Sequence, residues 1–230
     1  MKKILLIGDS IRLGYDDYVK ESMKNVAEVY YPAENCQSAA VVLTTLHAWA
    51  DGLGLYEADA VHFNAGHWDN LRIYGDEPIM PIEAYAVNIR RIAQRIRFLF
   101  PDAKIIFATT TPVYEAGFIE EFVARRNSDI EAYNAAACEA LADLDVTIND
   151  LYSLMKDQPV DCFSDRTHFY TAKATELLGG QVTRTLCDAL ALETSLLTPP
   201  DAQKYHKPEG LFTDIAAVEK KGHIYVQKQR

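Results

Sequence analysis

Short apolar runs and helix-like patterns alternate along the chain as far as residue 191. Five runs have the length of strands, and they span residues 4–7, 27–31, 58–63, 104–108 and 146–148. The stretches between them carry apolar residues at roughly 3.6-residue spacing, which is typical of helices, at 13–23, 38–53, 82–99, 129–142 and 171–191. This alternation predicts an α/β fold of three layers, with right-handed crossovers and a five-stranded parallel sheet between two layers of helices.

Polar residues follow each predicted strand at the point where it ends. They are Ser10 after the first strand, 35–38 after the second, 64–69 after the third, 110–114 after the fourth, and Asp165 with His168 after the fifth. In open parallel sheets, ligands bind beyond the carboxyl ends of the strands. The sequence therefore predicts one functional site at this edge of the sheet.

The residue types at this edge match nucleophilic acyl transfer. Gly8, Asp9 and Ser10 end the first strand, so a serine hydroxyl is expected at the sheet edge. A histidine can take the proton of such a hydroxyl, and a carboxylate can hold the histidine in the right tautomer. Asp165 and His168 are three residues apart, close enough to pair within one turn. Each motif alone could be no more than a helix cap, whereas their joint presence favours catalysis.

These two motifs resemble the conserved blocks of the SGNH/GDSL hydrolases, a superfamily of esterases with a flavodoxin-like α/β fold. The resemblance covers residues 3–190 and rests on Gly8-Asp9-Ser10 and on Asp165-Arg166-Thr167-His168. It implies that Ser10 is the nucleophile, His168 the base and Asp165 the carboxylate that orients it. We expect residues 1–192 to form the hydrolase domain and 193–230 an arm packed on this domain or on a neighbouring subunit.

The oxyanion hole is where this sequence departs from the family pattern. The family has a glycine after the second strand and an asparagine in a Gly-x-Asn-Asp block after the third. Here the second block, 34–38, lacks glycine, and Trp68 would occupy the asparagine position if Gly66 were aligned with the family glycine. We prefer Asn64 as the side-chain donor, although it could simply be a turn residue. The expected donors are the backbone N–H groups of Ser10 and of one of Cys36, Gln37 and Ser38, together with the Asn64 side chain.

Further polar and aromatic residues near these blocks are candidates for contacts with the substrate. They are Arg12, His67, Trp68, Asp69, Arg126 and Asn127. An aromatic ring beside polar groups suits the face of a sugar, although a tryptophan is more often part of the core.

Composition narrows the range of partners and cofactors. The chain has 230 residues and a formal net charge of −10, which argues against nucleic acid and anionic membranes as partners. The four cysteines lack the spacing of a zinc site or a disulfide framework, so we expect neither a metal nor another cofactor. The N-terminal apolar run is too short for a secretory signal and no run could span a membrane, so we expect a cytoplasmic protein.

Together these features predict a serine esterase that removes a short acyl group, with acetyl the first choice, from a small-molecule or saccharide ester. A carbohydrate O-acyltransferase is an alternative, because the block around Asn64 is similar to that of plant polysaccharide O-acetyltransferases. A non-catalytic binding module with the same fold is a second alternative. The arm at 193–230 suggests a homo-oligomer.

Overall fold

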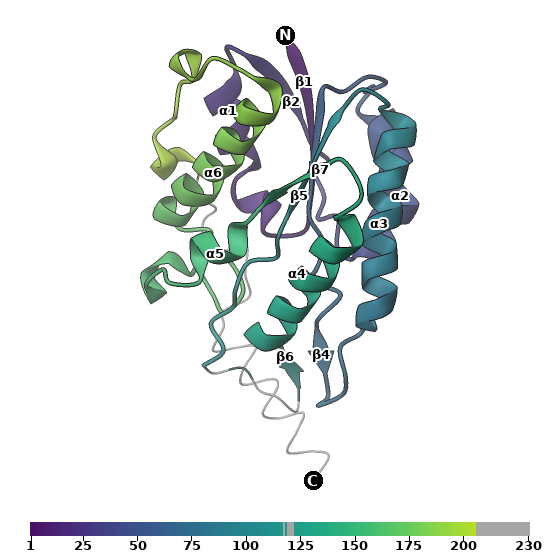
Figure 1. Ribbon diagram of the computed structural model, residues 1–230. Helices are drawn as coiled ribbons and strands as arrows, with labels where there is room; N and C mark the ends of the chain where they lie inside the picture. Colours follow the sequence, from purple (N-terminus) through teal and green to yellow (C-terminus); the bar gives the residue numbers. More distant parts are fainter. Residues whose placement is uncertain (117, 119–121, 206–230) are drawn as a thin grey trace.

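A five-stranded parallel sheet forms the centre of the computed structural model, which describes residues 1–116, 118 and 122–205 (Figure 1). The strand order is β2-β1-β3-β5-β7, and all four pairings are parallel. The strands are β1 (Lys2–Ile7), β2 (Ala27–Tyr30), β3 (Ala60–Phe63), β5 (Lys104–Ala108) and β7 (Val146–Asn149). The α/β class and the five-stranded parallel sheet are as predicted.

Helices cover both faces of the sheet (Figure 1). They are α1 (Asp16–Met23), α2 (Ala39–Gly52), α3 (Ile82–Leu99), α4 (Asn127–Leu141), α5 (Leu151–Met155) and α6 (Ala172–Leu190). Alternate residues of β1 enter two separate cores, because successive side chains of a strand point to opposite faces. Leu5 and Ile7 pack with residues of α2, α3 and α4, whereas Ile4 and Leu6 pack with α1, α5 and α6.

The structure also contains short elements that the apolar pattern does not predict. Strands β4 (Arg72–Ile73) and β6 (Val123–Ala124) pair antiparallel and join the long loops that follow β3 and β5. Helix α5 lies inside the segment between β7 and the predicted active-site turn. Four 3-10 helices complete the described part, at Arg12–Gly14, Val160–Cys162, Thr194–Leu196 and Ala202–Lys204.

The first residues of the predicted C-terminal arm pack against the layer formed by α1 and α6. The backbone N–H of Thr198 donates to the carbonyl of Ser22, and the Asn25 side chain donates to the carbonyl of Leu196. The ring of Tyr205 meets that of Tyr18 edge to face, with 6.4 Å between centroids. The rest of the predicted arm, residues 206–230, lies outside the described residues, and the oligomer expected through the arm stays a prediction.

Candidate active site

Ser10, His168 and Asp165 form one hydrogen-bonded chain at the carboxyl edge of the sheet. The Oγ atom of Ser10 lies 2.8 Å from Nε2 of His168, and Nδ1 of His168 lies 2.6 Å from Oδ2 of Asp165. A carboxylate can only accept, so Nδ1 carries the proton and Nε2 is left to accept the proton of Ser10. The geometry is therefore that of a nucleophile, a base and an orienting carboxylate.

The turn that holds the acid and the base is fixed by Asp165 itself. Its Oδ1 accepts the backbone N–H groups of Thr167 and His168 at 2.7 and 2.8 Å, while its Oδ2 accepts the His168 ring. Burial raises the pKa of Asp165, but the hydrogen bonds and charge of His168 and the two backbone donors outweigh it and lower the pKa. Asp165 is thus an anion at neutral pH, as its interaction with the imidazole requires.

Tyr170 supports the base and the nucleophile together, a role that sequence reasoning missed. Its hydroxyl donates to the carbonyl of Ser10, and its ring lies 5.1 Å from that of His168 between centroids. Gly14 allows this packing, because a Cβ there would be 2.6 Å from the Tyr170 ring. The only signal in the sequence was the position of Tyr170 two residues after His168.

The predicted backbone donors of the oxyanion hole differ in whether they are available. The N–H of Cys36 donates to the Gly8 carbonyl at 3.1 Å, and that of Gln37 donates to Asn35 Oδ1 at 2.8 Å. Among the described residues, no acceptor is found for the N–H of Ser38 or of Ser10. Ser38 therefore replaces Cys36 and Gln37 as the candidate from the second block. Burial also raises the pKa of the Cys36 thiol to about 11, so this thiol is protonated at neutral pH.

Asn64 lies where β3 ends, beside the first residue of the nucleophile block. Its side chain is buried, and a Cβ added to Gly8 would fall 2.2 Å from its Oδ1 atom. The same Cβ would fall 2.7 Å from Cβ of Arg12, so no side chain other than hydrogen fits at residue 8 while both neighbours keep their positions. Gly8 is therefore required by the close approach of Asn64 and Arg12.

If Asn64 is the oxyanion donor predicted from the sequence, we expect Gly8→Ala to lower the rate of ester hydrolysis by roughly 100-fold, as Asn64→Ala would, because the first displaces this donor and the second removes it. The measurement is kcat for p-nitrophenyl acetate. Gly52→Ala is the matched control, since a Cβ there meets nothing within 4 Å. Full activity of both Gly8→Ala and Asn64→Ala would show that Asn64 is not a donor.

Family comparison assigns this arrangement of residues to a known group of enzymes. The model of the GDSL-like lipase/acylhydrolase family matches residues 6–172, a range that includes all three residues of the hydrogen-bonded chain. The chain belongs to this family. The resemblance inferred from the two sequence motifs is therefore confirmed.

Relatives show the same family with limited identity. A GDSL esterase/lipase of Arabidopsis thaliana, CPRD49, is 28% identical over 122 residues, which cover 49% of this chain and 47% of that protein. The chain thus spans about half the length of the curated relatives it matches. The crystal structure of a lipase/acylhydrolase from Enterococcus faecalis has a TM-score of 0.65 at 21% identity, covering 87% of this chain and 99% of that one.

A carbohydrate acetylesterase family member from Sinorhizobium meliloti shares the fold as well. Its TM-score is 0.60 at 19% identity, and the alignment covers 84% of this chain and all of that one, 100%. At this identity the similarity concerns the fold alone.

Three of the six predicted substrate contacts are buried and engaged within the protein, so the structure corrects these predictions. Arg12 is 0% exposed, pairs with Asp16 at 2.6 Å and donates to the Glu34 carbonyl. His67 is also buried, with Nε2 3.1 Å from Thr111 Oγ1. Both side chains contact other residues of the protein and are fully buried, so neither is accessible to a ligand.

Asp69, the third buried residue, links the loop after β3 to the start of α2. Both of its carboxylate oxygens accept the N–H of Ala39, at 3.0 and 3.1 Å. This contact fixes the backbone directly after Ser38, the remaining candidate donor from the second block. Burial raises the pKa of Asp69 to about 7; the Ala39 donor opposes this shift and the carboxyl group of Asp9 adds to it.

The other three predicted contacts differ among themselves. Asn127 accepts the N–H of Val113 and donates to its carbonyl, so its amide holds the loop after β5 and is not free for a ligand. Arg126 is exposed at the start of α4. Trp68 is 37% exposed, so its ring is accessible and its predicted contact with the substrate stays a prediction.

We expect the stability of Asp69→Asn relative to the natural protein to rise between pH 5 and pH 8. The pKa of Asp69 is higher in the folded protein than in the unfolded chain. Its carboxyl group therefore contributes fully to stability when the pH is below the unfolded pKa, and this contribution is lost as the pH rises through the folded pKa of about 7. An asparagine oxygen still accepts from Ala39 but does not ionise. Urea unfolding should show the difference growing by roughly 2 kcal/mol. A difference independent of pH would contradict the raised pKa.

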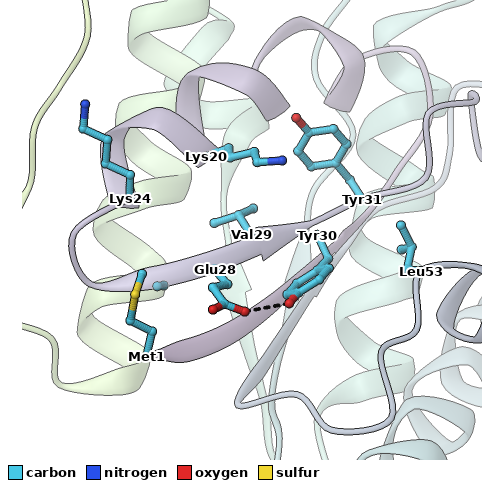
Figure 2. Close-up of a pocket in the computed structure, with 9 residues that line it drawn as sticks. Met1, Lys20, Lys24, Glu28, Val29, Tyr30, Tyr31 and Leu53 are labelled. Atoms are coloured by element: carbon cyan, nitrogen blue, oxygen red, sulfur yellow. Dashed lines mark hydrogen bonds between the residues drawn. The ribbon is translucent and has the colours of Figure 1, made fainter.

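A separate cavity of about 380 Å³ lies at the open edge of β2 (Figure 2). Lys20 of α1 and Lys24, which directly follows this helix, line it together with Glu28 and Tyr30 of β2, whose side chains are hydrogen-bonded to each other. None of the predicted site residues lines this cavity, so it is distinct from the candidate active site.

No helix in the described part of the chain is long and apolar enough to cross a membrane. The same described residues contain no cluster of His, Cys, Asp and Glu that could bind a metal ion.

Proposed function

We propose that this protein is a serine esterase that removes a short acyl group, acetyl in the first instance, from a carbohydrate ester. The observation that carries the proposal is the continuous hydrogen-bonded chain from Ser10 through His168 to Asp165. This arrangement activates a hydroxyl for attack on a carbonyl carbon and needs no cofactor.

Acylation begins when His168 Nε2 takes the proton of Ser10 as Oγ attacks the ester carbonyl. The carbonyl oxygen becomes an oxyanion, for which the Ser10 and Ser38 N–H groups and the Asn64 amide are the proposed donors. The tetrahedral intermediate collapses when His168 returns its proton to the leaving alcohol. The sugar hydroxyl is then free, and the acyl group is bound to Ser10 as an ester.

Deacylation repeats the same steps with water as the nucleophile. His168 takes a proton from water, the resulting hydroxide attacks the acyl carbon, and the proton then passes to Ser10 Oγ. The products are the free acid and the regenerated serine. Asp165 remains ionised throughout, because its task is to stabilise the imidazolium that forms twice in each cycle.

Two observations support a saccharide as the alcohol part. Trp68 presents an accessible aromatic ring on the loop after β3, and such rings stack on sugar faces. The fold is also that of a solved structure described as a carbohydrate acetylesterase family member. An accessible aromatic ring and this fold favour an ester of a small acyl group with a polar alcohol over an ester with a long lipid chain.

The test compares p-nitrophenyl acetate, butyrate and octanoate with acetylated xylo-oligosaccharides. We expect rapid hydrolysis of the acetyl ester, a decline with chain length, and release of acetate from the oligosaccharide. Faster hydrolysis of the octanoate ester would contradict the proposal and indicate a lipase. If none of the esters were hydrolysed, the esterase assignment itself would be wrong.

An acyltransferase would share the first half of this mechanism, and the block from Asn64 to Trp68 keeps it as the second candidate. In that case an acceptor sugar hydroxyl would replace water. Product analysis with p-nitrophenyl acetate and added xylo-oligosaccharide separates the two. Transfer of acetyl to the sugar in preference to release of acetate would favour the transferase.

A further inference from the structure

Arg125 connects the two loops on either side of the candidate active site. It follows strand β6, and its Nε donates to the carbonyl of His67 at 2.7 Å. Its Nη1 lies 3.4 Å from Oγ1 of Thr167, the residue between Asp165 and His168 in the active-site turn. The guanidinium therefore lies beside the acid and the base, although its side chain was not among the predicted site residues.

The donors of this guanidinium are only partly used by the protein. A guanidinium has five N–H groups, and only Nε and Nη1 of Arg125 have acceptors in the described part of the chain. Within that part, no carboxylate lies within ion-pair distance of Arg125. Arg125 is half-buried, so the residue keeps some contact with solvent while Nε and Nη1 hold its side chain in place. An unused donor on a side chain held in this way is preorganised for a ligand.

Charges around Arg125 indicate which kind of acceptor it suits. Burial lowers the pKa of Arg125 to about 10, and the nearby carboxyl groups of Asp9 and Asp165 oppose this shift. The side chain stays protonated at neutral pH, and the carboxylate of Asp165 is an anion close to it. A further anion would be repelled by this carboxylate, whereas a neutral oxygen would gain a charge-assisted hydrogen bond without that cost.

We propose that Arg125 is a substrate-binding residue, which donates from Nη2 to a neutral hydroxyl or ring oxygen of the saccharide that carries the ester. The inference rests on the proposed function and extends it by assigning a residue that selects sugar esters over simple esters. An aryl ester such as p-nitrophenyl acetate has no such oxygen, so it gains nothing from Arg125.

The experiment measures kcat and KM of Arg125→Met and Arg125→Lys with acetylated xylo-oligosaccharide and with p-nitrophenyl acetate. For Arg125→Met we expect kcat/KM on the oligosaccharide to fall roughly 10- to 100-fold, mainly through KM, and the aryl ester to change less than about threefold. Arg125→Lys keeps one cationic donor, so its kcat/KM on the oligosaccharide should lie between those of the natural protein and Arg125→Met. Arg91→Met, on the exposed face of α3, is the matched control and should change neither substrate.

Equal losses on both substrates would overturn the inference, because they would show that Arg125 only positions the loops. Thr167→Val tests this positioning role, since it removes the hydroxyl that Nη1 contacts and keeps the guanidinium. If Arg125 only positioned the loops, this variant would lose activity equally on both substrates. A larger loss for Arg125→Met on an acetylated oligogalacturonide than on the xylo-oligosaccharide would point to a carboxylate ligand and also overturn it. If the natural protein hydrolyses the aryl ester but no acetylated saccharide, the carbohydrate assignment itself fails before any variant is compared.

Discussion

Replacing Ser10 with alanine is expected to lower kcat for p-nitrophenyl acetate by about 10⁴-fold or more and to leave the fold intact. The Oγ atom of Ser10 is the only protein atom proposed to bond to the acyl carbon, and its loss leaves His168 Nε2 without the proton it is placed to accept. What remains is catalysis by the oxyanion donors alone, which is several powers of ten weaker.

Two controls separate this loss from unfolding. Ser153→Ala removes an exposed hydroxyl on α5 and should keep full activity. The melting temperature of Ser10→Ala should stay within about 2 °C of the natural protein, as is usual for a surface-accessible change away from the core. A fluorophosphonate probe should label Ser10 in the natural protein and nothing in the variant. Equal activity of Ser10→Ala and the natural protein would exclude the acyl-enzyme mechanism, and failure of the probe to label Ser10 would favour the non-catalytic binding module.

The fold and the hydrogen-bonded chain were predictable because they depend on local patterns. An apolar run of five residues can fill a buried strand, and in a parallel sheet all the carboxyl ends meet at one edge. Ser10 and His168 are 158 positions apart, yet Ser10 follows β1 and His168 lies in the segment that follows β7, so the topology predicts that both reach the same edge of the sheet. The pairing of Asp165 with His168 needed only one turn of chain.

The roles of the residues around Ser10, His168 and Asp165 could not be predicted, because they depend on contacts between segments that no local pattern connects. Arg12 looked like a ligand contact because it follows the nucleophile, but Asp16 and the Glu34 carbonyl hold it inside the protein. Arg125 gave no signal, since its position depends on the pairing of strand β6 with β4, which no local pattern predicts. The choice among the donors of the second block depended on which backbone N–H was already used.

The structure also explains why this chain has glycine at residue 8. The constraint comes from two close neighbours, because a Cβ there would lie 2.2 Å from Oδ1 of Asn64 and 2.7 Å from Cβ of Arg12. The nucleophile block and Asn64, the proposed oxyanion donor, are thus packed against each other through a residue with no side chain. A change in either one is expected to move the other, so their effects should not be additive.

Asp165→Asn is expected to lower kcat by about 10⁴-fold while leaving the active-site turn folded. The asparagine oxygen can still accept the N–H groups of Thr167 and His168, which now go to Asp165 Oδ1. The amide nitrogen would then take the place of Oδ2, 2.6 Å from His168 Nδ1. An amide N–H donates, so Nδ1 would have to accept and the proton would move to Nε2.

A histidine with its proton on Nε2 cannot take the proton of Ser10, because that nitrogen now donates to Oγ. The variant therefore has every residue in place but the wrong tautomer, and it also lacks the negative charge that stabilises the imidazolium. Asp161→Asn, an exposed carboxyl beside the same turn, is the control and should keep near-natural activity. The decisive measurement is kcat at neutral pH alongside the melting temperature. A loss below tenfold with an unchanged melting temperature would mean that Asp165 holds the turn and does not orient the base.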